Sequence, residues 1–241
     1  VVERFRREAI AVAQLSHPNI VAVYDTIDDT IDGESRQAVV MQLINGKSLR
    51  QLLDEQKRLS AELTMHIGVA IAAALDCAHR AQMVHRDVKP GNILLANDEQ
   101  KGGRSSGSDS TPVPRPLASS PKVSDFGLAK RLASEATRTQ GPAGTPAYMA
   151  PEQARGEVAA VCPQTDLFSV GACLFQLVSG RPSLECASTG ALHAALQDLG
   201  SGKIPRLRDV RPDAPPQLEA ICSRAIPSLV RPCRRRISIR M

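Results

Sequence analysis

The chain has 241 residues, 42% of them hydrophobic, so it can bury a sizeable core as one domain or a two-lobed unit. Its 30 basic and 25 acidic residues leave a net charge of +5, and aromatic residues make up only 2% of the chain. A nucleic-acid-binding protein usually has a stronger basic bias and more aromatic side chains for stacking, so we expect no nucleic-acid partner. Much of the basic excess lies in residues 231–241, which we interpret as a solvated basic tail.

The 6 cysteines are far apart and form no C-x-x-C pair, which argues against a metal site and favours reduced, mostly buried thiols. The most apolar run, residues 66–80, has polar groups at both ends, and no run approaches the roughly 20 residues that cross a bilayer. We therefore expect no membrane segment in this chain and a cytoplasmic location. A membrane anchor outside the chain is left as an open alternative, because the sequence begins at Val1 rather than Met, in the middle of a sequence pattern.

The first part of the chain predicts one helix and a hairpin. Residues 3–15 carry apolar side chains at helical spacing. Residues 19–27 and 37–44 are rich in β-branched residues, and the Asp32-Gly33 pair between them favours a turn that joins two antiparallel strands.

The second part predicts a mainly helical arrangement with one interruption. Ser48 and Ser60 are each expected to cap a helix with apolar residues every three or four positions. After a strand-like run at residues 93–96, residues 97–121 are rich in Ser, Gly and Pro, which predicts a disordered insertion. The run from Thr165 predicts a buried helix that is ended by Gly180 and followed by Pro182. Two weaker helices are expected at residues 192–199 and 218–226.

Four motifs follow one another along the chain. They are "HRDVKPGN" at residues 85–92, "DFG" at residues 125–127, "GTPAYMAPE" at residues 144–152 and "TDLFSVG" at residues 165–171. Each alone is more often a turn or a loop, so only their joint occurrence in this order carries weight. Together they resemble the eukaryotic-type protein kinase family, especially its bacterial Ser/Thr members.

The resemblance implies an α+β, protein kinase-like fold with two lobes. Residues 1–44 would form a partial small lobe with one helix, two strands and a hinge, and residues 45–230 a mainly helical large lobe with the catalytic and activation loops. The family's glycine-rich loop and strand lysine have no match, because Val1 falls after the point where they would lie. We therefore expect an incomplete small lobe, an N-terminally truncated catalytic domain, and weak or no activity of the chain as given.

The resemblance also assigns the chemistry of the site. Asp87 would be the catalytic base that aims the substrate hydroxyl, and Lys89 would direct its ammonium at the transferring phosphate. Asn92 and Asp125 would hold Mg²⁺, a cation that prefers oxygen ligands. The implied cofactors are ATP and Mg²⁺.

Nucleotide binding is assigned to the hinge and to the first helix. Backbone groups at Gln42 and Ile44, next to Met41, would bind the adenine edge, although a buried strand is the simpler interpretation of these residues. Glu8 matches the helix carboxylate that pairs with the strand lysine in the family. On its own Glu8 would be an exposed glutamate beside Arg4 and Arg7, and without the lysine that interpretation gains weight.

The remaining candidates are regulatory or structural. Arg86 precedes the base, which in the family implies control by phosphorylation of the activation loop. The regulatory candidates there are Thr137 and Thr139, with Thr145 shaping the floor of the peptide site. The structural candidates are His85, Phe126, Gly127, Glu152 and Asp166. The family's arginine partner of Glu152 has no clear match; Arg234, Arg235 and Arg236 are the candidates.

The function that the resemblance implies is transfer of the γ-phosphate of ATP to Ser or Thr hydroxyls of protein substrates, including self-phosphorylation in trans. A pseudokinase or regulatory binding module is the alternative, and it gains weight for the chain as given. A small-molecule phosphotransferase on a related fold fits less well, because "GTPAYMAPE" matches the segment that protein kinases use for peptides.

Overall fold

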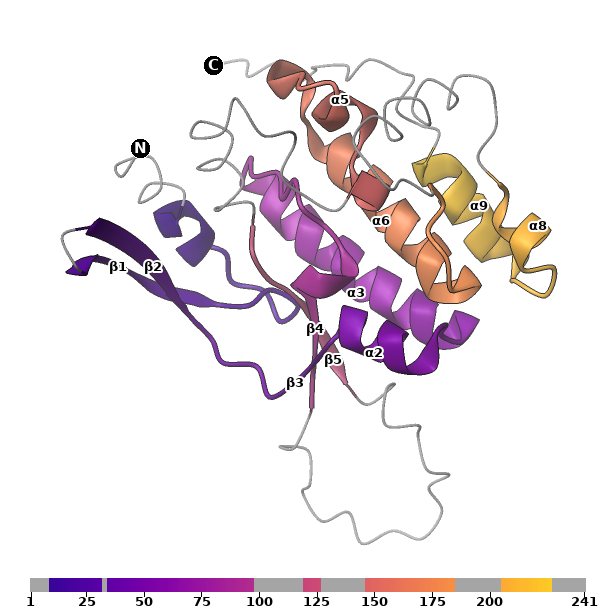
Figure 1. The fold of residues 1–241 in the computed structure, drawn as a ribbon, viewed down its shortest axis with the longest axis horizontal. Helices are drawn as coiled ribbons and strands as arrows, with labels where there is room; N and C mark the ends of the chain where they lie inside the picture. Colours follow the sequence, from indigo (N-terminus) through magenta and orange to yellow (C-terminus); the bar gives the residue numbers. More distant parts are fainter. Residues whose placement is uncertain (1–8, 32–33, 98–118, 127–145, 185–204, 227–241) are drawn as a thin grey trace, which may run out of the picture.

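The structure is a computed structural model that describes residues 9–31, 34–97, 119–126, 146–184 and 205–226. A small β-hairpin with a helical segment lies at one side, and a larger, mainly helical body makes up the rest (Figure 1). The described part of the chain is thus α+β, with few strands in the smaller lobe, as the sequence predicted.

The hairpin of the small lobe consists of β1 (Val23–Ile31) and β2 (Glu34–Met41). The strands are antiparallel, as predicted, and their register ends at the Ile31 and Glu34 pair, on either side of the predicted turn residues Asp32 and Gly33. Both strands extend further into the predicted connection than expected. Ladder hydrogen bonds override the low strand propensity of the aspartates at positions 28 and 29, which are paired in the register.

A short three-stranded sheet contains the first element of the large lobe. It has the antiparallel order β3 (Gly46–Ser48), β4 (Ile93–Ala96) and β5 (Ser120–Val123). Strand β3 was not predicted, because three residues carry no periodicity. A Cβ on Gly46 would lie 1.9 Å from the carbonyl oxygen of Leu95, so the close approach of β3 to β4 requires glycine.

The edges of the predicted insertion belong to this sheet. Strand β5 begins at Ser120, so the last two residues of the predicted range 97–121 are paired with β4. At the other end, the Asn97 amide donates to the Asn45 carbonyl at 2.8 Å. Backbone pairing therefore corrects the bounds that composition alone indicated.

Two capped helices follow the sheet. In α2 (Leu49–Gln56) the Ser48 hydroxyl accepts from the Gln51 amide at 3.2 Å, and the Gln51 side-chain oxygen accepts from the Ser48 amide at 2.8 Å. In α3 (Ala61–Arg80) the Ser60 hydroxyl accepts from the Leu63 amide at 3.2 Å. Both predicted caps are confirmed. They could be predicted because a cap depends on residues only three positions apart.

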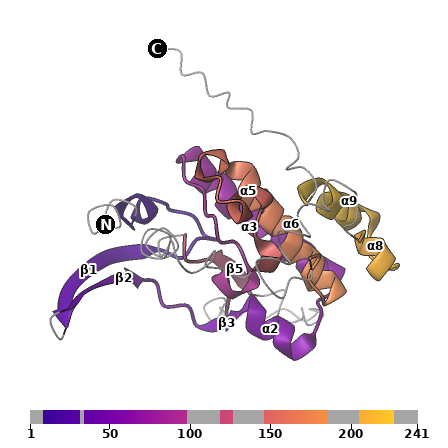
Figure 2. The same ribbon diagram turned by 45° about the horizontal axis from the view of Figure 1, so that its top comes forward.

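The core of the large lobe lies between α3 and α6 (Pro163–Ser179), with α9 (Pro216–Ala225) on the far side of α6 (Figure 2). The helix α6 ends at Gly180, whose φ of 79° is in the left-handed region. Shorter elements complete the lobe: η1 (Pro90–Asn92), η3 (Pro146–Tyr148), α5 (Pro151–Ala154), η4 (Val158–Ala160) and α8 (Leu207–Val210).

Helix α3 is longer and more apolar than the sequence analysis anticipated. Among the described residues it is the one helix whose length and composition would suffice to cross a membrane. The expectation that no apolar run approaches that length was therefore wrong. In this structure its apolar side is core: Ile67, Ile71 and Ala74 are completely buried, and α3 packs against α6 and β5. Its hydrophobicity is accounted for by that packing.

The four described cysteines are free thiols. Cys173 and Cys222 are buried, whereas Cys77 and Cys162 are partly exposed. Burial raises the pKa of the Cys222 thiol to about 12. The two buried thiols therefore behave as small core side chains.

The contact between α6 and α9 predicts a stability difference between two helical glycines. A Cβ on Gly171 would lie 2.5 Å from the Cβ of Ala225, whereas the nearest atoms to a Cβ on Gly68 belong to the flexible side chain of Leu174, with its methyl groups at 3.1 and 3.5 Å. We expect Gly171→Ala to lower the free energy of unfolding by about 1–3 kcal/mol through overpacking. Gly68→Ala should be neutral or stabilising in urea unfolding, because alanine favours helices. Equal effects of the two substitutions would contradict the close helix contact.

Candidate active site

The catalytic loop, residues 85–92, is fixed by a carboxylate from the start of α6. Asp166 is completely buried, and its Oδ1 accepts from the Arg86 amide at 2.8 Å. Its Oδ2 accepts from the His85 amide at 2.9 Å and lies 2.7 Å from Nε2 of His79. One carboxylate thus satisfies two backbone donors of the loop and an imidazole of α3.

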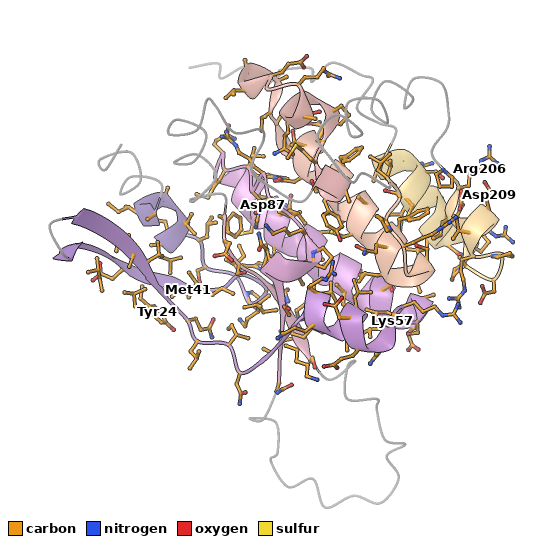
Figure 3. The ribbon with its side chains drawn as sticks, viewed as in Figure 1. Tyr24, Met41, Lys57, Asp87, Arg206 and Asp209 are labelled. Carbon is orange, nitrogen blue, oxygen red and sulfur yellow. The ribbon has the colours of Figure 1, made fainter. Side chains whose placement is uncertain are left out.

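Within the loop, three predicted residues interlock. Nζ of Lys89 lies 2.8 Å from Oδ2 of Asp87, and Nδ2 of Asn92 donates to the same oxygen at 3.1 Å and to the Asp87 carbonyl at 2.9 Å. Asp87 and Lys89 are only partly exposed. Figure 3 places Asp87 near the centre of the molecule, away from Tyr24 and Met41 of the hairpin.

Asp125 is connected to this cluster through the end of β5. The Ser124 amide donates to the Asn92 carbonyl at 2.9 Å, and the Ser124 hydroxyl donates to Oδ2 of Asp125 at 3.2 Å. Asp125 has a φ of 57°, a left-handed conformation that is uncommon outside glycine and is concentrated at functional sites. The structure therefore brings Asp87, Asn92 and Asp125 into one region.

His85 lies beneath this cluster as a neutral imidazole. Its Nδ1 accepts from the Asp87 amide at 3.2 Å, so its Nε2 carries the proton and donates to the Ser124 carbonyl at 2.9 Å. Its ring contacts that of Phe126, with the centroids 4.5 Å apart. Complete burial lowers the pKa of His85, although the neighbouring carboxylates, Asp166 first among them, act in the opposite direction.

The lowered pKa of His85 predicts how stability depends on pH. Below the usual histidine pKa of about 6.5, the unfolded chain takes up a proton that the folded His85 refuses, so stability falls on acidification, by at most about 1.4 kcal/mol per pH unit for one group. Urea midpoints measured between pH 7.5 and 5.5 should decrease for the parent protein. The decrease should be smaller in His85→Gln and unchanged in the exposed-site variant His66→Gln. An unaltered pH dependence in His85→Gln would contradict the burial of a neutral imidazole.

A shallow cavity opens beside the catalytic loop. Its walls come from the loop, the segment before α5, and α5 and α6. The lining residues are Arg86, Asp87, Val88, Lys89, Tyr148, Met149, Gln153 and Ser169. The Ser169 hydroxyl donates to the Tyr148 carbonyl at 2.8 Å, which ties the cavity wall to α6.

Glu152 is buried at the start of α5, with 5% of its surface exposed. Its Oε1 accepts from the Thr165 hydroxyl at 2.5 Å. The arginine candidates for pairing with it, Arg234 to Arg236, lie outside the described residues. Five other candidate residues also lie outside the described residues: Glu8, Gly127, Thr137, Thr139 and Thr145.

The hinge candidates lie at the end of β2. Met41 pairs with Val23 in the hairpin and is 38% exposed. The Gln42 amide donates to the Ala22 carbonyl at 2.8 Å, so this amide is already hydrogen-bonded to the backbone that precedes β1. The carbonyl of Gln42 and the backbone of Ile44 are then the groups that an adenine edge could meet.

Two contacts of the site were missed by the sequence analysis. One is His79 against Asp166, and the other is the hydrogen bond from Nε2 of Gln153 to the Arg86 carbonyl at 2.8 Å. The partners are 87 and 67 residues apart, so no local signal reports these contacts. The one available signal is that His79 and Gln153 lie near recognised motifs in the sequence.

This fold and this cluster define the catalytic domain of a protein kinase. The sequence profile described as "Protein kinase domain" matches residues 2–236, and the chain belongs to this family.

Its relatives include bacterial kinases. The chain is 37% identical over 227 residues to a probable serine/threonine-protein kinase of Streptomyces coelicolor, covering 92% of this chain and 30% of that protein. It is 36% identical over 222 residues to the serine/threonine-protein kinase PknA of Mycobacterium tuberculosis, covering 91% and 45%. The chain thus spans less than half of the length of these relatives.

A solved structure shows the same fold. The crystal structure of Rad53 1-466 in complex with AMP-PNP superposes with a TM-score of 0.68 over 93% of this chain and 50% of that one. At 23% sequence identity, this likeness supports the fold alone.

Proposed function

We propose that the protein transfers the γ-phosphate of ATP to Ser or Thr hydroxyls of protein substrates. The observation that carries the proposal is the interlocked group of Asp87, Lys89 and Asn92, with Asp125 joined to it through Ser124. In this group the Lys89 ammonium and the Asn92 amide both contact one carboxylate oxygen of Asp87, beside a cavity. A turn without a function would not need this arrangement.

Each side chain has a separate part in the proposed reaction. Asp87 lines the cavity, where its carboxylate would orient the substrate hydroxyl and accept its proton. Lys89, which now neutralises Asp87, would turn its charge toward the transferring phosphate. Lysine at this position is the basis for proposing Ser or Thr, rather than Tyr, as the acceptor.

The residues present fit Mg²⁺. The amide nitrogen of Asn92 is occupied by Asp87, which directs its oxygen elsewhere, and the carboxylate of Asp125 is exposed at the end of β5. Among the described residues no group of three His, Cys, Asp or Glu side chains could hold a metal alone. This suits a cation that takes few protein ligands and shares phosphate oxygens and water. When bound, Mg²⁺ would neutralise charge on the phosphates.

The other predicted contributions extend the proposal. Met41, Gln42 and Ile44 would position the adenine, and Glu8 would support the phosphates from the first helix. Arg86 lines the cavity, where it could pair with a phosphate added to the activation loop at Thr137 or Thr139.

Thr145, in the motif before α5, would shape the peptide site. Self-phosphorylation in trans and a cytoplasmic location belong to the same proposal.

The test is phosphate transfer to a generic basic protein. A version of the protein extended upstream should incorporate labelled phosphate from ATP, recovered as phosphoserine or phosphothreonine after hydrolysis, and removal of Mg²⁺ with EDTA should reduce incorporation to background. Incorporation on tyrosine alone would contradict the proposed acceptor. Nucleotide binding without any transfer would overturn the proposal and favour the pseudokinase alternative.

A further inference from the structure

The residue before the proposed base has an unusual backbone. Arg86 has a φ of 68°, in the left-handed region that non-glycine residues adopt only at a cost. The peptide that links Arg86 to Asp87 sets the direction in which the Asp87 side chain leaves the backbone. Whatever fixes this peptide therefore also fixes the carboxylate.

Hydrogen bonds hold Arg86 from two sides. Its amide donates to the buried carboxylate of Asp166 at 2.8 Å, and its carbonyl accepts from Nε2 of Gln153 at 2.8 Å. The carbonyl belongs to the Arg86–Asp87 peptide itself, so the bond from Gln153 resists rotation of that peptide. The N–H of the same peptide, the Asp87 amide, donates to Nδ1 of His85 at 3.2 Å, and Asp166 restrains the two preceding peptides, so Gln153 is the one of these partners that comes from α5.

Gln153 is itself positioned for this contact. It lies in α5, whose residues Pro151 and Ala154 are buried, and its Oε1 accepts from the Ala150 amide at 3.3 Å. With oxygen and nitrogen both engaged, the amide has one orientation that satisfies both partners. Gln153 also lines the cavity together with Asp87.

We propose that Gln153 is a positioning residue that couples α5 to the orientation of Asp87 by holding the Arg86–Asp87 peptide. The inference rests on the proposed function for its catalytic consequence, but the bridge itself can be measured without activity. Because α5 follows the segment that resembles the peptide-binding floor, the bridge ties that segment to the catalytic loop.

The first experiment isolates the donated hydrogen bond. Gln153→Glu keeps the oxygen that accepts from Ala150 and removes the N–H that reaches Arg86. Gln51→Glu is the matched control, because Gln51 has the same place in α2, is exposed, and accepts from the Ser48 amide at 2.8 Å.

The first readout is hydrogen exchange of the amides in residues 85–92. We expect Gln153→Glu to accelerate exchange there at least threefold, with α3 unchanged, and Gln51→Glu to leave it unchanged. Exchange at the parent rate in Gln153→Glu would overturn the inference. Equal acceleration in both variants would also overturn it, since the cause would then be a general loss of stability.

The second readout is the split between kcat and KM. Misplaced Asp87 should lower kcat by about tenfold in Gln153→Glu, with KM for ATP unchanged, because the nucleotide contacts lie elsewhere. A change in KM for ATP alone would contradict positioning of Asp87. If the version extended upstream transfers no phosphate either, the proposed function fails, and the exchange experiment still decides whether the bridge exists.

Discussion

Asp87→Asn is expected to lower the rate of phosphate transfer by about 10²- to 10⁴-fold, the range that a positioned general base contributes. Asparagine has the same shape, but it cannot accept the proton of the substrate hydroxyl. It also leaves Lys89 without the carboxylate that lies 2.8 Å away, and it sets an amide against Nδ2 of Asn92. Initial rates at saturating ATP measure the effect.

The control is Asp54→Asn on the surface of α2. Asp54 forms an exposed ion pair with Arg50, and no residue of α2 lines the cavity. Its rate should equal that of the parent, because exposed pairs contribute little. If Asp87→Asn kept more than a tenth of the parent rate, Asp87 would not be the base.

Asp166→Asn is expected to lower the free energy of unfolding by about 3 kcal/mol, as expected when a buried charged group loses its hydrogen-bonded partners. The carboxylate accepts from the amides of His85 and Arg86 and contacts His79 from a completely buried position. An asparagine has one accepting oxygen, so its NH₂ group must face at least one donor. Urea unfolding measures the loss.

Asp209→Asn provides the comparison for this effect. Asp209 is an exposed aspartate whose Oδ2 accepts from the Arg206 amide at 3.2 Å (Figure 3). Its replacement should cost less than about 1 kcal/mol, since surface changes are usually small. If both variants lost the same free energy, the buried brace of the catalytic loop would be contradicted.

Sequence could predict the features that depend on neighbouring residues. Ser48 and Ser60 are cap signals read within three positions, and Gly180 marks the end of α6 through its own backbone freedom. The hairpin was predicted from its Asp32-Gly33 turn for the same reason. The kinase fold itself was predicted from the order of four motifs.

The features that sequence could not predict depend on tertiary contacts. The extra length of β1 comes from pairing with β2, and strand β3 is defined by its contact with β4. The engagement of Asp166 with His79 joins residues 87 positions apart. Residue types identified the candidate site, but the hydrogen bonds that orient it arise from packing between distant segments.

We propose that Asp87, Asn92 and Asp125 surround one metal- and nucleotide-binding site. Mn²⁺ in place of Mg²⁺, added with a non-hydrolysable ATP analogue, broadens NMR signals of nuclei near the metal. We expect strong broadening at Asn92 and Asp125 together, and clear broadening at Asp87, before other parts of the large lobe are affected. Broadening that spared Asn92 and Asp125 while it affected another region would contradict a shared metal site at these residues.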